Sequence, residues 1–245
     1  MIGAIASGLF FFSFLFFLLF LYSLRKQRNR LASLFACFFL TISVYILGCA
    51  LELLANSLEQ LKFALAVEYF GGSFIVAFWL LISYKFAFMK PATLVQTLLI
   101  MTVPFITLFL GVTNEYHHLV YTGFSVYEYG GHLLTQLARG PWYYIALLFA
   151  YAASISGMAV FYRAWRMKIS QFRRQAFWLF LGAIWPFFAS VVYNAGLFPL
   201  PIDLTPFGLS ATGICFSIAI FRFRFLNCRK SSRMSLFWIT MKEFS

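Results

Sequence analysis

The sequence predicts an all-α polytopic membrane protein, a bundle of seven transmembrane helices with its N-terminus outside and its C-terminus in the cytoplasm. Three observations lead to this fold class. The 245 residues are 62% hydrophobic, against roughly 45–50% in soluble domains, and only 11% are charged. Most of the chain divides into apolar runs of about 20 residues, the length that crosses a hydrocarbon layer of roughly 30 Å. Basic residues gather in alternate connections, as the positive-inside rule requires.

Apolar runs place the helices in order along the chain. The first run lacks a basic segment before it and is longer than the apolar core of a signal peptide, so we expect it to be retained as a helix. The predicted helices span residues 3–24, 31–54, 62–88, 92–113, 141–165, 176–197 and 205–226. Together they form one membrane domain over residues 1–227, followed by a short basic cytoplasmic tail over 228–245.

Prolines and caps mark several of these helices. Three prolines are expected in a first helical turn, where the missing N–H costs nothing: Pro91, Pro141 and Pro206. Thr205 or Asp203 is expected to cap the last helix. Pro104 and Pro186 lie inside predicted helices and predict kinks, which occur where freed backbone groups find partners or face a cavity.

Charge distribution sets the orientation. Seventeen of the nineteen Lys and Arg residues fall on four segments that face the cytoplasm if the N-terminus is outside, and only Lys62 and Arg139 do not. Six of the seven acidic residues lie at the outer side. Because the basic residues occur in short runs between apolar stretches, and not on one soluble face, we expect no nucleic-acid partner. The location expected is the bacterial inner membrane, with multiple passes.

The longest connection, residues 114–140, is predicted to be external. Two runs rich in aromatic and β-branched residues flank Gly130 and Gly131. A glycine pair between such runs is typical of a β-hairpin turn. We therefore expect a short hairpin that forms a lid over the helix bundle.

Ionisable side chains within the membrane are the first candidates for function, since each costs about 2.5–3.5 kcal/mol to insert. Glu68 lies one to two turns below the outer end of the third helix, and Glu52 lies at a similar depth on the antiparallel second helix. With Asn114, Tyr193 and Asn194 they predict a polar pocket under the hairpin. The alternative is that both acids reach the headgroup region and are simply solvated.

Several chemistries are not expected. The histidines His117, His118 and His132 match a metal site in composition only, because no ligand spacing accompanies them. The sequence has no P-loop and no GxSxG elbow, and the last helix has no lysine for a retinal Schiff base. The four cysteines show no paired spacing. We predict no enzyme activity, no metal and no cofactor.

A series of short motifs runs through all seven predicted helices. In order they are Leu51-Glu-Leu-Leu-Ala-Asn-Ser-Leu-Glu59, Glu68-Tyr69 with Trp79, Thr113-Asn114 with His117 or His118, Gly140-Pro141-Trp142, Arg174-Gln175, Gly182-Ala183 with Pro186, Tyr193 and Gly196, Asp203-Leu-Thr-Pro206, and Phe221-Arg-Phe-Arg-Phe-Leu226. Over about residues 10–227 the chain thereby resembles the N-terminal seven-transmembrane sensor region of bacterial histidine kinases and related diguanylate cyclases. It differs at Glu68, where the family usually has glutamine, and at Ser190, often asparagine.

The resemblance implies a receptor module of bacterial signal transduction. We hypothesise that a small signal binds in the outer half of the bundle and that the last helix transmits the response. The residues expected to shape the outer pocket are Glu52, Glu68, Tyr69, Asn114, His118, Tyr193 and Asp203. Arg222 and Arg224 are expected to fix the depth of the last helix against anionic lipid headgroups.

The expected partners are the lipid bilayer, an unidentified small signal and a separate cytoplasmic kinase or cyclase. The last expectation arises because members of this family continue into an output domain, whereas residues 228–245 contain no phosphoacceptor histidine. The alternative to a separate output partner is that the chain is a truncated remnant. A homodimer is also a possible assembly. The alternative function is a small solute or ion transporter that uses Glu68, although no inverted repeat is evident. An intramembrane enzyme is the third alternative.

Overall fold

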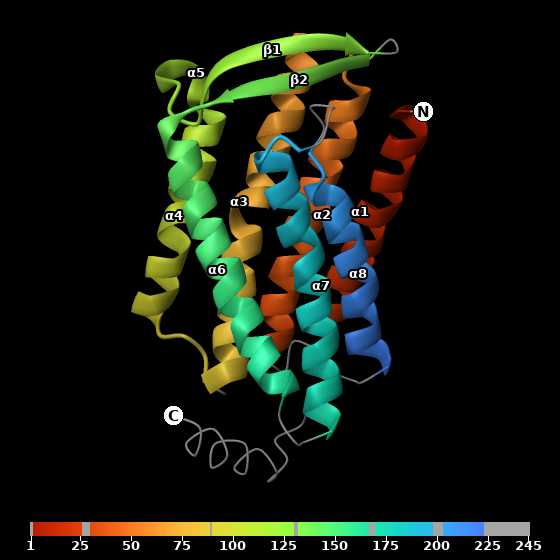
Figure 1. The fold of residues 1–245 in the computed structure, drawn as a ribbon, viewed down its shortest axis with the longest axis vertical. Coiled ribbons are helices and arrows are strands. Elements are labelled where there is room, and N and C mark those ends of the chain that lie inside the picture. Colours follow the sequence, from red (N-terminus) through yellow and green to blue (C-terminus); the bar gives the residue numbers. More distant parts are fainter. Residues whose placement is uncertain are drawn as a thin grey trace.

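The computed structural model describes residues 2–25, 30–88, 90–129, 132–166, 170–197 and 203–222. Figure 1 shows a bundle of long helices with a β-hairpin across one end. The long helices are α1 (Ile2–Leu24), α2 (Arg30–Leu54), α3 (Leu58–Phe88), α4 (Leu94–Val112), α6 (Pro141–Trp165), α7 (Ser170–Asn194) and α8 (Thr205–Arg222). Between α4 and α6 come the single turn α5 (Asn114–His117) and the strands β1 (Tyr121–Tyr129) and β2 (His132–Arg139).

The long helices have the composition of membrane spans. Within the described residues, six are long and apolar enough to cross a bilayer, and α8 is apolar over the shorter range Thr205–Ile220. Residues 223–226, which the sequence assigns to the last helix, lie outside the described residues, as does the predicted tail over 228–245. At roughly 1.5 Å per residue the 31 residues of α3 extend about 46 Å, which exceeds a hydrocarbon layer of roughly 30 Å.

Helices that follow one another along the chain pack side by side. The pairs α1–α2, α2–α3, α3–α4, α6–α7 and α7–α8 are in contact, and α3 also contacts α6. The bundle closes because α8, the last helix, packs against α1 and α2 (Figure 1). This closure brings the N-terminal end of α8 beside the hairpin end of α2, which positions the site described below.

Two helices begin at polar caps and not where the apolar runs predict. The predicted third helix starts at 62, but α3 begins at Leu58 because the Ser57 hydroxyl accepts the Gln60 N–H at 3.3 Å. The predicted fourth helix starts at 92, but α4 begins at Leu94 after a capping box of Thr93 and Gln96. Pro91 therefore precedes this helix and is not in its first turn.

Helix α7 begins and ends earlier than the predicted range 176–197. It extends back to Ser170 through polar and basic residues, and it ends at Asn194. Gly196 follows with a φ of 66°, the left-handed conformation that glycine adopts without strain. The Gly196 N–H donates to Tyr193 O, and the Leu197 N–H donates to Val192 O, both at 3.1 Å. These two bonds form a Schellman motif, which terminates the helix.

The predicted hairpin is confirmed. Strands β1 and β2 pair antiparallel, from Tyr121 opposite Arg139 to Tyr129 opposite His132, with a register irregularity between Tyr121 and Gly123. The glycines expected at the turn, Gly130 and Gly131, lie outside the described residues. Figure 1 shows the hairpin lying across the bundle at the end where the N-terminus is found.

The opposite half of the bundle is filled by aromatic side chains. Phe35, Phe39, Phe161 and Phe216 are 0% exposed, and Trp79 is 5% exposed. Phe35 and Phe39 both pack on Phe216, with ring centroids 6.2 and 6.4 Å apart. Because these rings come from α2, α3, α6 and α8, the cluster ties four helices together. We call these five residues, together with Phe38, the aromatic cluster.

Candidate functional site

A cavity of about 360 Å³ lies beneath the hairpin. Its walls come from α2, α3, α4, α6, α7, α8 and the two strands. The polar and ionisable residues on these walls are Tyr45, Glu52, Glu68, Tyr69, Ser73, Thr107, Tyr121, Arg139, Tyr143, Tyr151, Ser154, Ser190, Tyr193, Asn194, Asp203, Thr205 and Thr212. Such a mixture of apolar wall and a few converging polar groups is typical of a small-molecule site.

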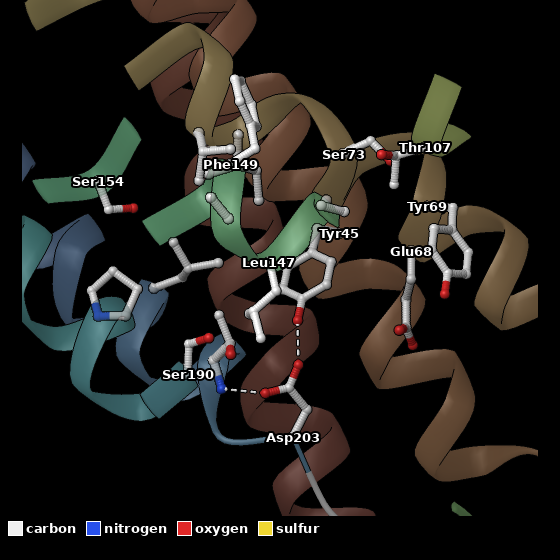
Figure 2. Close-up of a pocket in the computed structure, with 18 of the residues that line it drawn as sticks. Tyr45, Glu68, Tyr69, Ser73, Thr107, Leu147, Phe149, Ser154, Ser190 and Asp203 are labelled. Carbon is white, nitrogen blue, oxygen red and sulfur yellow. Dashed lines mark hydrogen bonds between the residues drawn. The ribbon is translucent and has the colours of Figure 1, made fainter. Parts of the chain in front are cut away.

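Glu68 presents a buried oxygen to this cavity. Its Oε1 has no hydrogen-bond partner among the described residues. The carboxyl of Glu52 lies against that of Glu68, and Asp203 is within electrostatic reach. Figure 2 shows Glu68 and the neighbouring Tyr69 lying on the same side of the cavity. Because a buried polar atom without a partner is costly, this oxygen marks a position where a ligand atom can compensate.

Asp203 connects the start of α8 to α2. The Tyr45 hydroxyl donates to Asp203 Oδ2 at 2.6 Å, and the Thr205 N–H donates to Asp203 Oδ1 at 2.8 Å (Figure 2). Of the two caps considered for this helix, Asp203 is therefore the one that accepts a backbone N–H at its first turn. The cavity wall and the first turn of α8 share this carboxylate.

Arg139 lies at the hairpin side of the cavity. Its guanidinium is 5.2 Å from the ring centroid of Tyr143 and 5.8 Å from that of Tyr193, and Nη1 donates to the Asn194 backbone oxygen at 3.0 Å. The Tyr143 hydroxyl donates to Asn194 Oδ1 at 2.6 Å. This network joins β2, α6 and α7 around the cavity.

Two of the predicted pocket residues, Asn114 and His118, are not among the residues that line the cavity, and Asn114 instead holds the base of the hairpin. Asn114 is 0% exposed; its Nδ2 donates to Tyr121 O, and its Oδ1 accepts from Val120 N, both at 2.8 Å. His118 is exposed and has a φ of 54°.

Burial, reinforced by the charge of Glu115, raises the pKa of Tyr121, so this phenol is a neutral polar group at the cavity.

The aromatic cluster forms the floor of the cavity. Phe38, Trp79 and Phe216 belong to both the cluster and the cavity lining. Phe216 of α8 stacks on Phe38 at 5.8 Å and on Trp79 at 5.9 Å, with interplanar angles of 28° and 29°. A molecule that fills the lower part of the cavity therefore meets a ring of α8 directly.

The structure thus brings together five of the seven residues predicted for the pocket: Glu52, Glu68, Tyr69, Tyr193 and Asp203. Sequence reasoning missed Tyr45 and Arg139. Tyr45 lies within an apolar run, and no sequence signal distinguishes it from the other twelve tyrosines of the chain. Arg139 was noted only as one of two basic residues that fall outside the positive-inside pattern, and that exception was the available signal. The residues predicted to kink α4 and α7, Pro104 and Pro186, both line the cavity.

Two further expectations concern Arg222 and Arg224 at the other end of the bundle and the absence of a metal site at the histidines. Arg222 is the last residue of α8, and Arg224 lies outside the described residues. Within the described ranges no three His, Cys, Asp or Glu side chains are grouped closely enough to hold a metal ion.

Comparison with known proteins gives one clear match. A family model described as the N-terminal 7TM region of histidine kinase matches residues 8–229. The match is to the membrane region of these kinases and not to a catalytic domain. No curated protein matches the chain. With nearly the whole chain covered, and with apolar helices long enough to span a bilayer, this multi-pass membrane protein belongs to the family of N-terminal seven-transmembrane sensor regions of histidine kinases.

Proposed function

We propose that this chain is a sensor module in which a small molecule binds the cavity under the hairpin and transmits its presence through α8. The observation that carries the proposal is that the cavity wall and the output helix share residues. Asp203 caps α8 while accepting the Tyr45 hydroxyl, and Phe216 of α8 lies in the cavity floor. A ligand that prefers one position of α8 shifts the population toward that position.

The site is proposed to include Glu52, Glu68, Tyr69, Tyr193 and Asp203, with Asn114 and His118 shaping the lid. Asn114 supports this role through its bonds to Val120 and Tyr121 at the base of the hairpin. The hairpin covers one end of the cavity through Tyr121, Leu137 and Arg139. Asn114 bonds to the start of β1, and Arg139 of β2 donates to the Asn194 backbone oxygen of α7, so both strands are joined to the helices.

The proposed orientation places the hairpin and the N-terminus outside a bacterial inner membrane. Both lie at the same end of the bundle in Figure 1. The opposite helix ends carry the basic residues Arg25, Arg30, Lys85, Arg163, Arg166 and Arg173. Since Lys and Arg favour cytoplasmic loops, this asymmetry supports an internal C-terminus. Arg222 and Arg224 then anchor the output end of α8 at the inner headgroups, where a separate kinase or cyclase is the proposed partner.

A cavity-filling pair of variants tests ligand binding. Ala150 lines the cavity, whereas Ala152, two residues away on α6, is exposed on the outer surface of the helix. We expect a small molecule to co-purify with the native chain, to be lost from Ala150→Trp and to be kept by Ala152→Trp, as measured by mass spectrometry. Absence of any bound molecule from the native chain, or equal retention by both variants, would contradict the proposed cavity.

A second experiment tests transmission through α8. The native cysteines are first replaced by serine. Spin labels are then attached at Ile214 of α8 and Leu98 of α4, which are both exposed. We expect the distance distribution between the labels to differ between ligand-bound and ligand-stripped protein in lipid nanodiscs. The matched control pair, Leu98 with Leu148 of α6, avoids α8 and is expected to stay unchanged. Identical distributions for the α8 pair in both states would refute transmission by this helix.

One observation favours the transporter as a second candidate. The unpartnered oxygen of Glu68 is also what a proton- or cation-carrying carboxylate requires. Purified chain in sealed vesicles distinguishes the two functions. Solute or proton flux that disappears in Glu68→Gln supports transport, whereas ligand binding without flux supports the sensor.

A further inference from the structure

The charge balance of the cavity wall points to a cationic ligand. Among the described residues, three acidic side chains line the cavity, those of Glu52, Glu68 and Asp203, against one basic side chain, that of Arg139. The guanidinium of Arg139 is already engaged, since it lies over the rings of Tyr143 and Tyr193 and donates to a backbone oxygen. The wall is therefore acidic in excess, and an anion would meet uncompensated repulsion.

Glu68 is the acceptor that a ligand can reach. Asp203 already accepts two hydrogen bonds, from Tyr45 and from the Thr205 N–H. Oε1 of Glu68 is buried and accepts none from the described residues. A protonated amine supplies both the missing donor and the opposite charge, and charge-assisted bonds of this kind are stronger than neutral ones.

Aromatic rings stand beside this acceptor. Tyr69 follows Glu68 on α3, and Tyr45 extends from α2 toward Asp203 across the same space (Figure 2). The faces of tyrosine rings attract organic cations, and a carboxylate among such rings is a favourable environment for an ammonium group.

The remainder of the cavity wall favours a ligand with an apolar body. No cluster of three metal-binding side chains occurs within the described ranges. The apolar part of the wall includes Val76, Leu147, Phe149 and Phe187, and the aromatic cluster forms the floor. Two hydroxyls on these walls, of Ser73 and Tyr151, also have no partner among the described residues. They offer positions for a further polar group on the ligand.

We propose that the cavity recognises an organic ammonium compound with an apolar, ring-sized body, its ammonium group bound by Glu68. This ligand class deepens the sensor function proposed above and rests on it.

Three probes of one shape test the charge preference: phenethylammonium, phenethyl alcohol and phenylacetate. Their affinities are measured by calorimetry on the full chain in lipid nanodiscs at neutral pH, with empty nanodiscs as the baseline for partitioning. We expect the ammonium to bind at least tenfold more tightly than the alcohol and the carboxylate to bind most weakly. This order in the native protein needs no variant.

A matched pair of variants locates the preference. Glu68→Gln is expected to bring the ammonium and the alcohol to equal affinity, while Glu59→Gln, an exposed acid on the same helix, keeps the tenfold difference. Equal binding of the three probes by the native chain, binding of none, or an undiminished preference in Glu68→Gln would overturn the ammonium assignment. The sensor function fails separately, through the Ala150→Trp and α8-distance experiments, which do not depend on ligand charge.

Discussion

The two halves of this bundle are built in opposite ways. Near the hairpin, the helices stand around a cavity of about 360 Å³ and are joined by hydrogen bonds such as that of Tyr45 to Asp203. At the other end, aromatic rings from four helices fill the interior, and four of them, those of Phe35, Phe39, Phe161 and Phe216, are fully buried. The first half has room for a guest, whereas the described residues of the second half pack ring against ring.

This difference shows how a displacement of side chains at the cavity can move side chains farther along the bundle. Close-packed interiors do not deform continuously, so a displacement at one side of a packed cluster moves its members together. Phe216 belongs to both halves, because its ring lines the cavity floor and packs on Phe35 and Phe39. The proposed sensor function assigns detection to the polar half and transmission to the aromatic half.

The largest expected effect lies in the aromatic half. Phe216→Ala removes a 0% exposed ring that packs on Phe38 and Trp79, and we expect a loss of about 3–5 kcal/mol in unfolding free energy. Ile214→Ala on the same helix is the control, because Ile214 is 54% exposed and faces away from the bundle. Denaturant titration in micelles measures both. Equal losses of unfolding free energy in the two variants would contradict the prediction that the buried ring stabilises the bundle more than the exposed side chain does.

A smaller effect is expected where the lid meets the bundle. Asn114→Ala removes the bonds of its amide to Val120 and Tyr121 and leaves buried backbone groups unpaired, at a cost of about 1–3 kcal/mol. We expect faster hydrogen exchange confined to the hairpin, with the aromatic half unchanged. Asn56→Ala, an exposed asparagine between α2 and α3, is the control. Uniform acceleration across both halves would contradict a role of Asn114 confined to the hairpin.

The bond between α2 and α8 is expected to contribute less than the lid. A double-mutant cycle with Tyr45→Phe and Asp203→Asn should give a coupling energy of about 0.5–3 kcal/mol, since the hydroxyl donates directly to the carboxylate. Repeating the cycle with Tyr144→Phe, an exposed tyrosine on α6, should give no coupling. A coupling of zero for the Tyr45 pair would mean that the polar half does not restrain the start of α8.

The smallest effect is expected at the outer surface. Lys62 and Glu115 form an ion pair in which both side chains are at least half exposed. Such pairs are screened by salt and contribute little to folding. We expect Lys62→Gln to leave the thermal unfolding midpoint unchanged at any salt concentration. A midpoint that falls with the substitution and recovers at high salt would place this pair among the structural contacts of the polar half.

Prediction from sequence was strongest for features with a long, regular signal. Apolar runs and the positive-inside pattern indicated a membrane helical bundle, and a glycine pair between aromatic runs indicated the hairpin. It was weaker at helix ends, where a single capping residue determines the residue at which the helix begins. The Ser57–Gln60 and Thr93–Gln96 signatures were present in the sequence and indicate the true starts of α3 and α4.

By itself, then, the sequence determined that the chain lies in a membrane, because its 62% of hydrophobic residues exceeds what a soluble domain buries and falls in runs long enough to span a bilayer as helices. It also indicated Glu68 as costly to insert and so a candidate for function. Only the tertiary structure brought Tyr45 to Asp203, 158 residues later, and Arg139 to Asn194, 55 residues later. Helix packing sets such pairings, and no local pattern encodes which faces of distant helices meet. The cavity exists only between those faces, and its polar wall and aromatic floor appear only once the bundle has closed.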